Sequence, residues 1–124
     1  MSNPKELKYS KTHEWVKQDG DTVVIGLTDF AQSELGDLVY INVPFVDDAV
    51  KVGASFADVE SVKAVSEVIS PVTGVVAEVN ESLVDTPELI NQAPYDAWII
   101  KVKDVSEYDE LLTAEEYEAF TKEG

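Results

Sequence analysis

Short runs of hydrophobic residues, rich in β-branched side chains and alternating with polar ones, recur along most of the chain. This alternation has the period of a β-strand with one buried face. Residues 13–17 and 22–27 lie on either side of the turn pair Asp19-Gly20, which predicts a first hairpin. The other runs that predict strands lie at residues 37–43, 50–52, 55–60, 65–70, 75–80 and 98–102. Many short strands separated by turn signals favour a mainly β fold, a barrel or a sandwich.

Helices are predicted at three places between and after these strands. Thr28 or Asp29 can cap a short helix that ends at Gly36. Residues 81–90 contain a proline and predict one or two short helical turns. A Thr-x-x-Glu capping box begins a C-terminal helix over residues 113–122. The Pro-Val-Thr-Gly sequence at residues 71–74 predicts a turn between two strands instead.

The length and composition of the chain suit a single domain. The chain has 124 residues, of which 44% are hydrophobic, and it has no segment rich in glycine, serine or proline that would separate two domains. We therefore expect one domain over residues 1–124. Residues 1–8 are mostly polar and are expected to form a loose lead-in to it.

The charge of the chain is strongly one-sided. Nine lysines and no arginine stand against 25 acidic residues, which gives a formal net charge of −16. Nucleic acids and anionic membranes repel such a polyanion, so neither is expected as a partner. The charge is equally compatible with docking onto basic patches of partner proteins and with plain solubility.

The kinds of residue present exclude most catalytic and metal sites. There is no cysteine, so the chain has no disulfide, no thiol nucleophile and no thiolate ligand. His13 is the only histidine, which excludes a multi-histidine metal cluster. No motif pairs it with a serine, so we interpret His13 as a structural residue. We predict no catalytic residue and no metal ligand.

The same sequence contains no targeting or membrane signal. No apolar run approaches the roughly 20 residues that a bilayer-spanning helix needs. The first residues carry charges of both signs and lack the apolar core of a signal peptide. These features predict a cytoplasmic protein of bacterial type without a membrane partner.

One lysine occupies a notable position in the predicted strand pattern. Lys63 lies between the strand runs at 55–60 and 65–70, which are expected to pair, so it is predicted at or near the tip of a hairpin. A hairpin tip is exposed and can be reached by a modifying enzyme. On this pattern alone, a solvated lysine in a turn remains the simpler interpretation.

The residues around this lysine change that interpretation. The segment Glu60-Ser61-Val62-Lys63-Ala64 resembles the lipoylation site of the glycine cleavage H-protein family. Further matches follow in the same order at residues 7–9, 12–16, 25–32, 35–37, 70–74, 79–81, 87–91 and 94–95. The sequence departs from the family where Asp96-Ala97 precedes Trp98, because the family usually has a glycine there. The resemblance therefore does not predict the shape of this loop.

The resemblance implies a small β barrel-sandwich hybrid of the kind that carries lipoyl or biotinyl groups, with lipoate joined to Lys63 by an amide. A lipoate ligase or a lipoyl or octanoyl transferase would attach it. In the family's cycle, a pyridoxal phosphate-dependent glycine decarboxylase passes the aminomethyl group of glycine to a lipoyl sulfur. A tetrahydrofolate-dependent aminomethyltransferase then takes it, and a flavin-dependent dihydrolipoyl dehydrogenase reoxidises the dithiol. The chain itself would be a carrier and not an enzyme.

The resemblance also implies a cleft that shelters the loaded lipoyl arm from water. A protonated amine in such a cleft is best bound by carboxylates. The candidates that the resemblance indicates are Glu14 and Glu67, with Thr12 as a neutral hydrogen-bond partner. Without the resemblance, all three would be interpreted as ordinary surface residues.

Two other functions remain open beside this one, and two are disfavoured. A lipoylated chain could also donate lipoate to 2-oxoacid dehydrogenases, and a chain left unmodified could be an interaction domain with the same fold. A biotin carrier is disfavoured, because its lysine usually lies in Met-Lys-Met, whereas Val62 and Ala64 flank the lysine here. Val62 also differs from the Asp-Lys-Ala that is typical of acyltransferase lipoyl domains.

Overall fold

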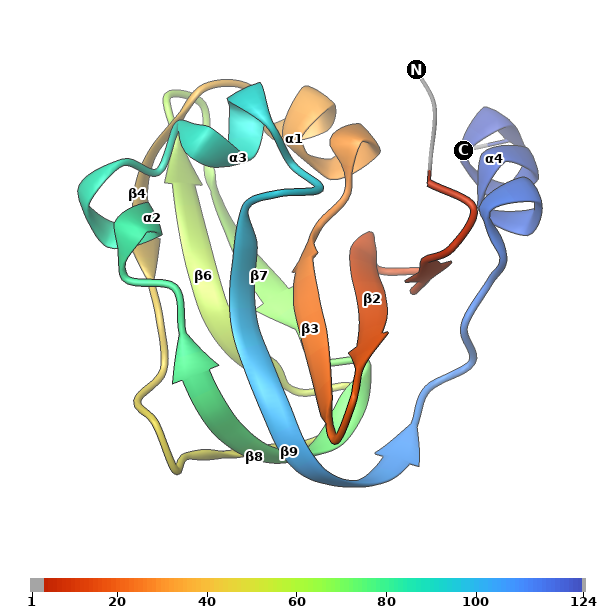
Figure 1. The fold of residues 1–124 in the computed structure, drawn as a ribbon. Helices are drawn as coiled ribbons and strands as arrows, with labels where there is room; N and C mark the ends of the chain where they lie inside the picture. The colour runs from red at the N-terminus through yellow and green to blue at the C-terminus, as the bar shows by residue number, and fades with distance from the viewer. Residues whose placement is uncertain (1–3, 124) are drawn as a thin grey trace.

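A computed structural model describes residues 4–123 as two antiparallel sheets with helices between and after their strands (Figure 1). The larger sheet has six strands in the order β1-β2-β3-β9-β8-β5. Their bounds are Lys8–Tyr9 for β1, Glu14–Asp19 for β2, Thr22–Leu27 for β3, Trp98–Tyr108 for β9, Val72–Val79 for β8 and Ala49–Val50 for β5. The smaller sheet has the order β4-β6-β7, with β4 at Leu38–Asn42, β6 at Ser55–Ser61 and β7 at Val65–Ile69. The mainly β fold predicted from the sequence is confirmed.

The first hairpin shows how local sequence sets strand pairing. Strands β2 and β3 pair in register from Glu14 opposite Leu27 to Asp19 opposite Thr22. Gly20 makes the turn with φ +60, a left-handed conformation that glycine adopts without a steric penalty. The predicted hairpin is therefore confirmed at the predicted turn.

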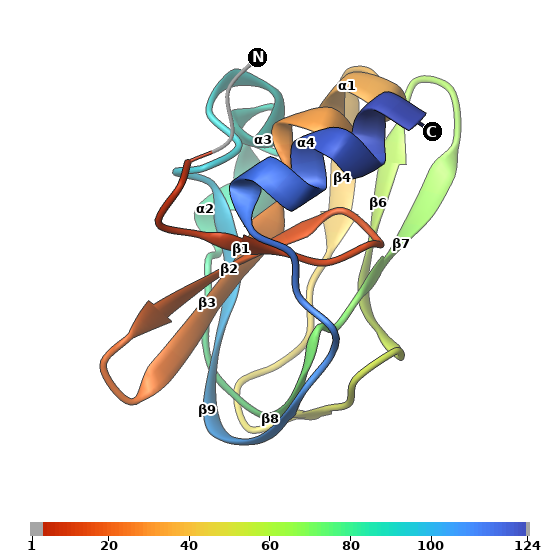
Figure 2. The same cartoon turned by 90° about the vertical axis from the view of Figure 1, so that its right-hand side faces the viewer.

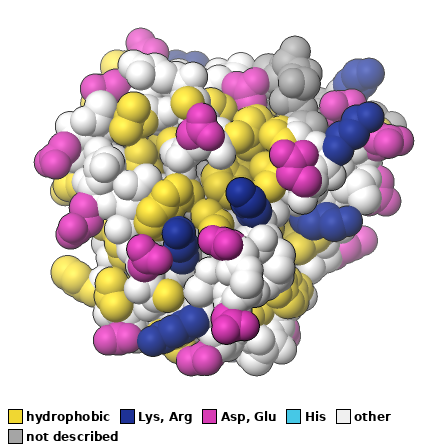
Figure 3. Space-filling model, in the orientation of Figure 1, with side chains coloured by type: hydrophobic (Ala, Val, Ile, Leu, Met, Phe, Trp, Pro, Cys, Tyr) yellow, Lys and Arg dark blue, Asp and Glu magenta, His cyan; other side chains and the backbone are white. Residues whose placement is uncertain are grey.

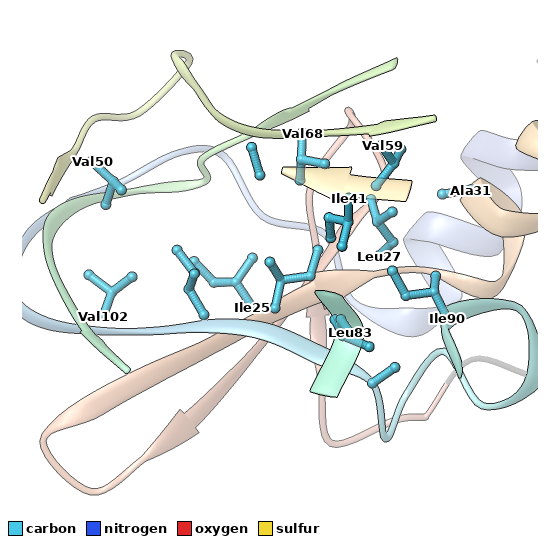
Figure 4. Packing of buried hydrophobic residues seen from close by; sticks show 14 of the residues in the cluster. Ile25, Leu27, Ala31, Ile41, Val50, Val59, Val68, Leu83, Ile90 and Val102 are labelled. Carbon is cyan, nitrogen blue, oxygen red and sulfur yellow. The ribbon is translucent and has the colours of Figure 1, made fainter. Parts of the chain in front are cut away.

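The hydrophobic core lies between the two sheets (Figure 4). Ile41, Val59 and Val68 of the smaller sheet point toward Ile25 and Leu27 of the larger one. Each of these five side chains is at most 4% exposed. Burial of this much aliphatic surface is the main stabilising contribution to the fold, at about 25 cal/mol per Å² of apolar area. A second cluster of buried residues packs under the C-terminal helix and consists of Leu7, Tyr9, Trp15, Val24, Ala114 and Tyr117.

The helices begin where the sequence predicts. Helix α1 (Asp29–Leu35) is capped by Thr28, whose hydroxyl accepts the N–H of Ala31 at 3.1 Å, and it ends at Gly36. The predicted helical turns after β8 are α2 (Ser82–Asp85) and α3 (Leu89–Gln92). Helix α4 (Ala114–Glu123) begins with a reciprocal capping box between Thr113 and Glu116.

Two strands are longer than the sequence predicts. The turn expected at residues 71–74 is wrong, because β8 already begins at Val72. The glycine that suggested a turn, Gly74, is needed for a close approach of two strands: a Cβ there would lie 2.6 Å from Cγ1 of Val102. Strand β9 continues past residue 102 to Tyr108, beyond Asp104, which has φ +53.

The start of the chain also differs from expectation. Residues 1–3 lie outside the described residues, but Leu7 is only 5% exposed and Lys8 begins β1, paired with Val16 of β2. The loose lead-in predicted over residues 1–8 is therefore wrong at Leu7 and Lys8. The physical reason is that the side chain of Leu7 is buried in the cluster under α4. Within residues 4–123, no helix is both long enough and apolar enough to cross a bilayer.

Candidate functional site

Lys63 lies in the turn between β6 and β7, so the hairpin tip predicted from the sequence is confirmed. Ser61 shapes this turn, because its hydroxyl oxygen accepts the N–H groups of Lys63 and Ala64, each at 3.1 Å. The N–H of Ser61 also donates to the carbonyl oxygen of Ala64 at 2.8 Å. Val62, Lys63 and Ala64 are all exposed. The tip is thus an exposed turn with a defined backbone.

The side chain of Lys63 lies across the C-terminal end of α1. Its Nζ donates to the carbonyl oxygen of Glu34 at 3.4 Å. The carbonyl groups at a helix C-terminus carry partial negative charge, which favours a cation there. Gly36 has φ +83, and a Cβ at this position would come within 3.0 Å of the Lys63 Cε. Gly36 therefore leaves room for the lysine side chain.

A cleft lies beside this lysine. The elements α1 and α4 and the β6–β7 tip lie together at this end of the molecule (Figure 2). Its volume is about 550 Å³, which is within the range of small-molecule sites. Residues from β2 and the turn before it, β3, α1, β6, β7 and α4 form its walls. The apolar lining residues are Leu27, Phe30, Ala31, Leu35, Val59, Val68 and Phe120. The polar lining residues are Thr12, His13, Glu14, Glu34, Ser66, Glu67 and Thr121.

Glu14 is the most deeply buried acid of the cleft, with 1% of its surface exposed. Burial raises the pKa of its carboxyl group from the ordinary 4.5 to about 7. Three donors oppose this rise. The hydroxyls of Ser10 (2.6 Å) and Thr12 donate to Oε1, and the N–H of Ile69 donates to Oε2 at 3.3 Å. The fold therefore holds this carboxyl group with three donors and moves its pKa toward neutral pH.

His13 connects the cleft to the C-terminal helix. Its Nδ1 lies 2.7 Å from the hydroxyl of Tyr117, which lies 2.8 Å from the hydroxyl of Thr28, the cap of α1. The His13 ring packs against Phe30 with centroids 4.7 Å apart. Burial lowers the pKa of the imidazole, and the nearby Glu34 carboxylate opposes this effect. These contacts give His13 a structural role, although it also lines the cleft.

The structure brings together the three residues that the resemblance indicated for a cleft. Thr12 lies in the turn before β2, Glu14 begins β2 and Glu67 is in β7, and all three line the same space. Glu14 is buried, whereas Thr12 and Glu67 are exposed. Lys63 is outside the lining but contacts Glu34, which is part of it.

The other residues of the lysine motif lie around the turn. Glu60 is half-buried on β6, where it is paired with Val65 of β7 and with Tyr40 of β4. The loop that departs from the family is closed by the N–H groups of Asp96 and Ala97, which both donate to the carbonyl oxygen of Ala93 at 3.0 Å. That loop therefore forms a turn after α3 and lines no part of the cleft.

Sequence reasoning missed the aromatic part of the cleft. Phe30 on α1 and Phe120 on α4 are far apart in the sequence, and both line the cleft. Each follows an ordinary amphipathic helix pattern, which predicts burial against the core. Phe120 is 37% exposed, and the sequence pattern does not predict that this side chain stays accessible in a cleft.

The arrangement suits a long, mostly apolar ligand chain that starts at the lysine. The apolar walls can pack against hydrocarbon, and the carboxyl groups of Glu14 and Glu67 can accept hydrogen bonds from a cationic end. The site thus combines apolar walls and carboxyl acceptors with an exposed lysine beside them.

Comparisons with known proteins agree with this geometry. The family model described as "Glycine cleavage H-protein" matches residues 7–124. The chain is 55% identical over 127 residues to the glycine cleavage system H protein of Geobacillus thermodenitrificans, with all of both chains covered. It is 54% identical over 120 residues to that of Staphylococcus carnosus, covering 94% of this chain and 95% of the relative.

A solved structure shows the same fold. The crystal structure of a glycine cleavage system H protein from Mycobacterium marinum superposes with a TM-score of 0.92 and 38% identity, covering 97% of this chain and 99% of that one. Sequence and structure thus agree over nearly the whole length. The chain belongs to the glycine cleavage H-protein family, and it is a non-catalytic, lipoyl-carrying shuttle subunit of the glycine cleavage system.

Proposed function

We propose that Lys63 is the residue that carries the lipoyl group, through an amide between its Nζ and the lipoyl carboxyl carbon. The observation that carries this proposal is the position of the lysine: it is exposed at a hairpin tip and adjoins a cleft of suitable size and lining. When attached, the lipoyl group supplies a disulfide that can accept the aminomethyl group of glycine. Acylation removes the ammonium charge, so the contact of Nζ with the Glu34 carbonyl is weakened.

The cleft residues fit this group. Phe30, Leu35, Val68 and Phe120 present apolar surface of the kind that packs against a hydrocarbon arm. Leu35 lies on α1 next to Glu34, whose carbonyl oxygen Lys63 reaches. An arm that begins at Lys63 can therefore enter the cleft over the end of α1, and the cleft walls exclude water from what it carries.

Thr12, Glu14 and Glu67 are proposed to bind the amine end of the cargo. A cation beside the Glu14 carboxyl group favours its ionised form, so binding lowers a pKa that is about 7 without cargo. Near neutral pH, Glu14 would then release a proton as the amine binds. The Thr12 hydroxyl donates to Oε1 of Glu14 and keeps the carboxylate oriented.

The partners are proposed to be the enzymes of the same system. They are glycine decarboxylase with pyridoxal phosphate, aminomethyltransferase with tetrahydrofolate and dihydrolipoyl dehydrogenase with flavin, together with a lipoate ligase or a lipoyl or octanoyl transferase. A net charge of −16 favours encounter with basic docking faces through electrostatic steering. The cytoplasmic location expected from the sequence stays a prediction.

The proposal is tested by the variant Lys63→Arg in a reconstituted glycine cleavage assay. Arginine keeps the positive charge but cannot form the amide, so glycine turnover should fall to the level without carrier. The unfolding midpoint should stay at the wild-type value because the side chain is exposed. Lys51→Arg, at another exposed lysine, is the matched control and should keep full turnover. Normal turnover by Lys63→Arg would show that the lipoyl group lies elsewhere.

A further inference from the structure

Asn91, in helix α3, fixes the segment that joins α1 to β4. Its Oδ1 accepts the N–H of Leu38 at 2.9 Å. Its Nδ2 donates to the carbonyl oxygen of Gly36 at 2.9 Å and to Oε1 of Gln32 at 3.1 Å. One half-buried amide thus binds both ends of the turn at Gly36–Leu38 and the last part of α1.

The Gly36–Leu38 segment in turn contacts the hairpin tip with the lysine. The carbonyl oxygen of Asp37 accepts the N–H of Val62, the residue before Lys63, at 3.1 Å. The Lys63 side chain passes over Gly36, where a Cβ would come within 3.0 Å of Cε. The backbone and the side chain at the tip therefore both rest on a segment that Asn91 binds.

Regular sheet pairing does not hold this segment in place by itself. The register between β4 and β6 shifts between Leu38 and Tyr40, so the ladder is irregular at the end of β4 that adjoins the tip. Strand β4 is also an edge strand, so a backbone N–H that points away from β6 needs an acceptor outside the sheet. For Leu38 that acceptor is the side chain of Asn91.

From this geometry we infer that Asn91 is a positioning residue for Lys63: it anchors the hairpin tip to the body of the protein, so that the lysine is presented in one place to the enzyme that acylates it and to the cleft. This inference rests on the proposed function of Lys63. Ser61 sets the internal shape of the tip, and Asn91 sets where that tip lies. Loss of the Asn91 bonds would leave the turn intact but allow it to move.

The test compares Asn91→Ala with a control at Asn80. Asn80 is also a half-buried asparagine whose amide binds backbone: Nδ2 donates to the carbonyl oxygen of Trp98 at 2.9 Å, and Oδ1 accepts the N–H of Ser82 at 3.3 Å. Its side chain bonds neither the Gly36–Leu38 segment nor the tip. Two quantities are measured on the full chain well below its unfolding temperature: the initial rate of lipoylation by a purified lipoate ligase with lipoate and ATP, and the hydrogen exchange rate of the Val62 amide.

Asn91→Ala should slow lipoylation by about tenfold, as expected for a displaced reacting group. It should also speed exchange at Val62. Asn80→Ala should leave both quantities at the wild-type value even if it lowers the unfolding midpoint. A second variant, Asn91→Asp, has the same size and keeps the acceptor for Leu38 but loses both N–H donors. It should also show slower lipoylation and faster exchange at Val62, and it serves as the test if Asn91→Ala does not fold.

Each outcome decides between the alternatives. Wild-type rates for both Asn91 variants would overturn the inference. Equal slowing in the Asn80 and Asn91 variants would also overturn it, because a general loss of stability would then explain the effect. If the ligase does not modify the wild-type chain at Lys63, the proposed function itself is overturned. That result is distinguishable from a normal lipoylation rate in the Asn91 variants, which would overturn only the role of Asn91.

Discussion

At the scale of single residues, Glu14 is the group whose chemistry depends most on the fold. It is held by three donors yet is 1% exposed, and the effect of burial prevails, so its pKa rises to about 7. The nearby acid Asp109 adds to the rise. Because the folded pKa lies above the unfolded value, this carboxyl group binds more protons in the folded than in the unfolded chain between about pH 4.5 and pH 7.

This linkage predicts how Glu14→Gln changes the dependence of stability on pH. The wild-type free energy of unfolding should fall as pH rises from 4.5 to 7, and Glu14 should account for about 3 kcal/mol of that fall. Glutamine does not titrate, so the variant should lose this part of the slope while keeping contributions from all other groups. The difference between the two chains is measured by urea unfolding at a series of pH values.

The sign of the difference is the decisive result. Stability of the variant relative to wild type should increase with pH across this window and become constant above it. Parallel curves for the two chains would show that the Glu14 carboxyl group keeps its ordinary pKa and carries full charge at neutral pH.

At the scale of elements, α4 is both a wall of the cleft and a separate packing unit. It contributes Phe120 and Thr121 to the lining, and Tyr117 anchors it in the cluster with Tyr9, to which its ring is stacked with centroids 4.9 Å apart. The Tyr117 hydroxyl also reaches Thr28 and His13. The shape of the cleft therefore depends on how well α4 is docked.

Tyr117→Phe tests this docking without changing the packing volume. The half-buried His13 and the buried Thr28 both lose a hydrogen-bond partner, so the free energy of unfolding should fall by about 1–3 kcal/mol. Hydrogen exchange in α4 should become faster than in β3. Tyr108→Phe is the control: its hydroxyl bonds Gln18 at 3.3 Å on a residue that is 49% exposed, so its loss should cost almost nothing. Equal stability of the two variants would contradict the anchoring role.

Most elements could be predicted from the sequence, because their signals are local. The Thr28 cap, the turn at Gly20 and the capping box at Thr113 all mark real boundaries. The turn predicted at residues 71–74 was wrong because glycine is favoured both in turns and where two strands approach closely, and Gly74 is of the second kind.

The candidate site could be predicted only in part. Lys63 at the hairpin tip follows from the strand pattern on either side of it. The cleft does not, because α1, α4, β2 and β7 meet there only through tertiary packing, and Thr12, Glu14 and Glu67 came from the family resemblance alone. Asn91 gave no sequence signal of its role, since its partners lie more than 50 positions away in the chain.

At the scale of the whole molecule, the net charge of −16 is the dominant property. Figure 3 shows acidic side chains spread over the face that it presents, with hydrophobic side chains between them. Among the described residues, only three ion pairs are formed, and at least one partner in each is well exposed. Such pairs contribute little to stability, so repulsion between the acids is largely uncompensated.

Salt should therefore stabilise the chain. Raising NaCl from 10 to 150 mM shortens the Debye length from about 30 to about 8 Å, which screens repulsion between acids across the surface. The free energy of unfolding from urea titrations at pH 7 should rise over this range, and KCl should have the same effect. A fall on adding salt would mean that attractive pairs outweigh the repulsion.

The lipoyl group proposed on Lys63 would change the mass of the chain, which can be measured on the intact protein. The protein would be purified from cells supplied with lipoate and an active ligase, weighed intact and then mapped by peptide digestion. We expect a mass increase of one lipoyl group, confined to the peptide that contains Lys63. A folded chain without any increase, or an increase on a peptide with another lysine such as Lys51 or Lys103, would contradict it.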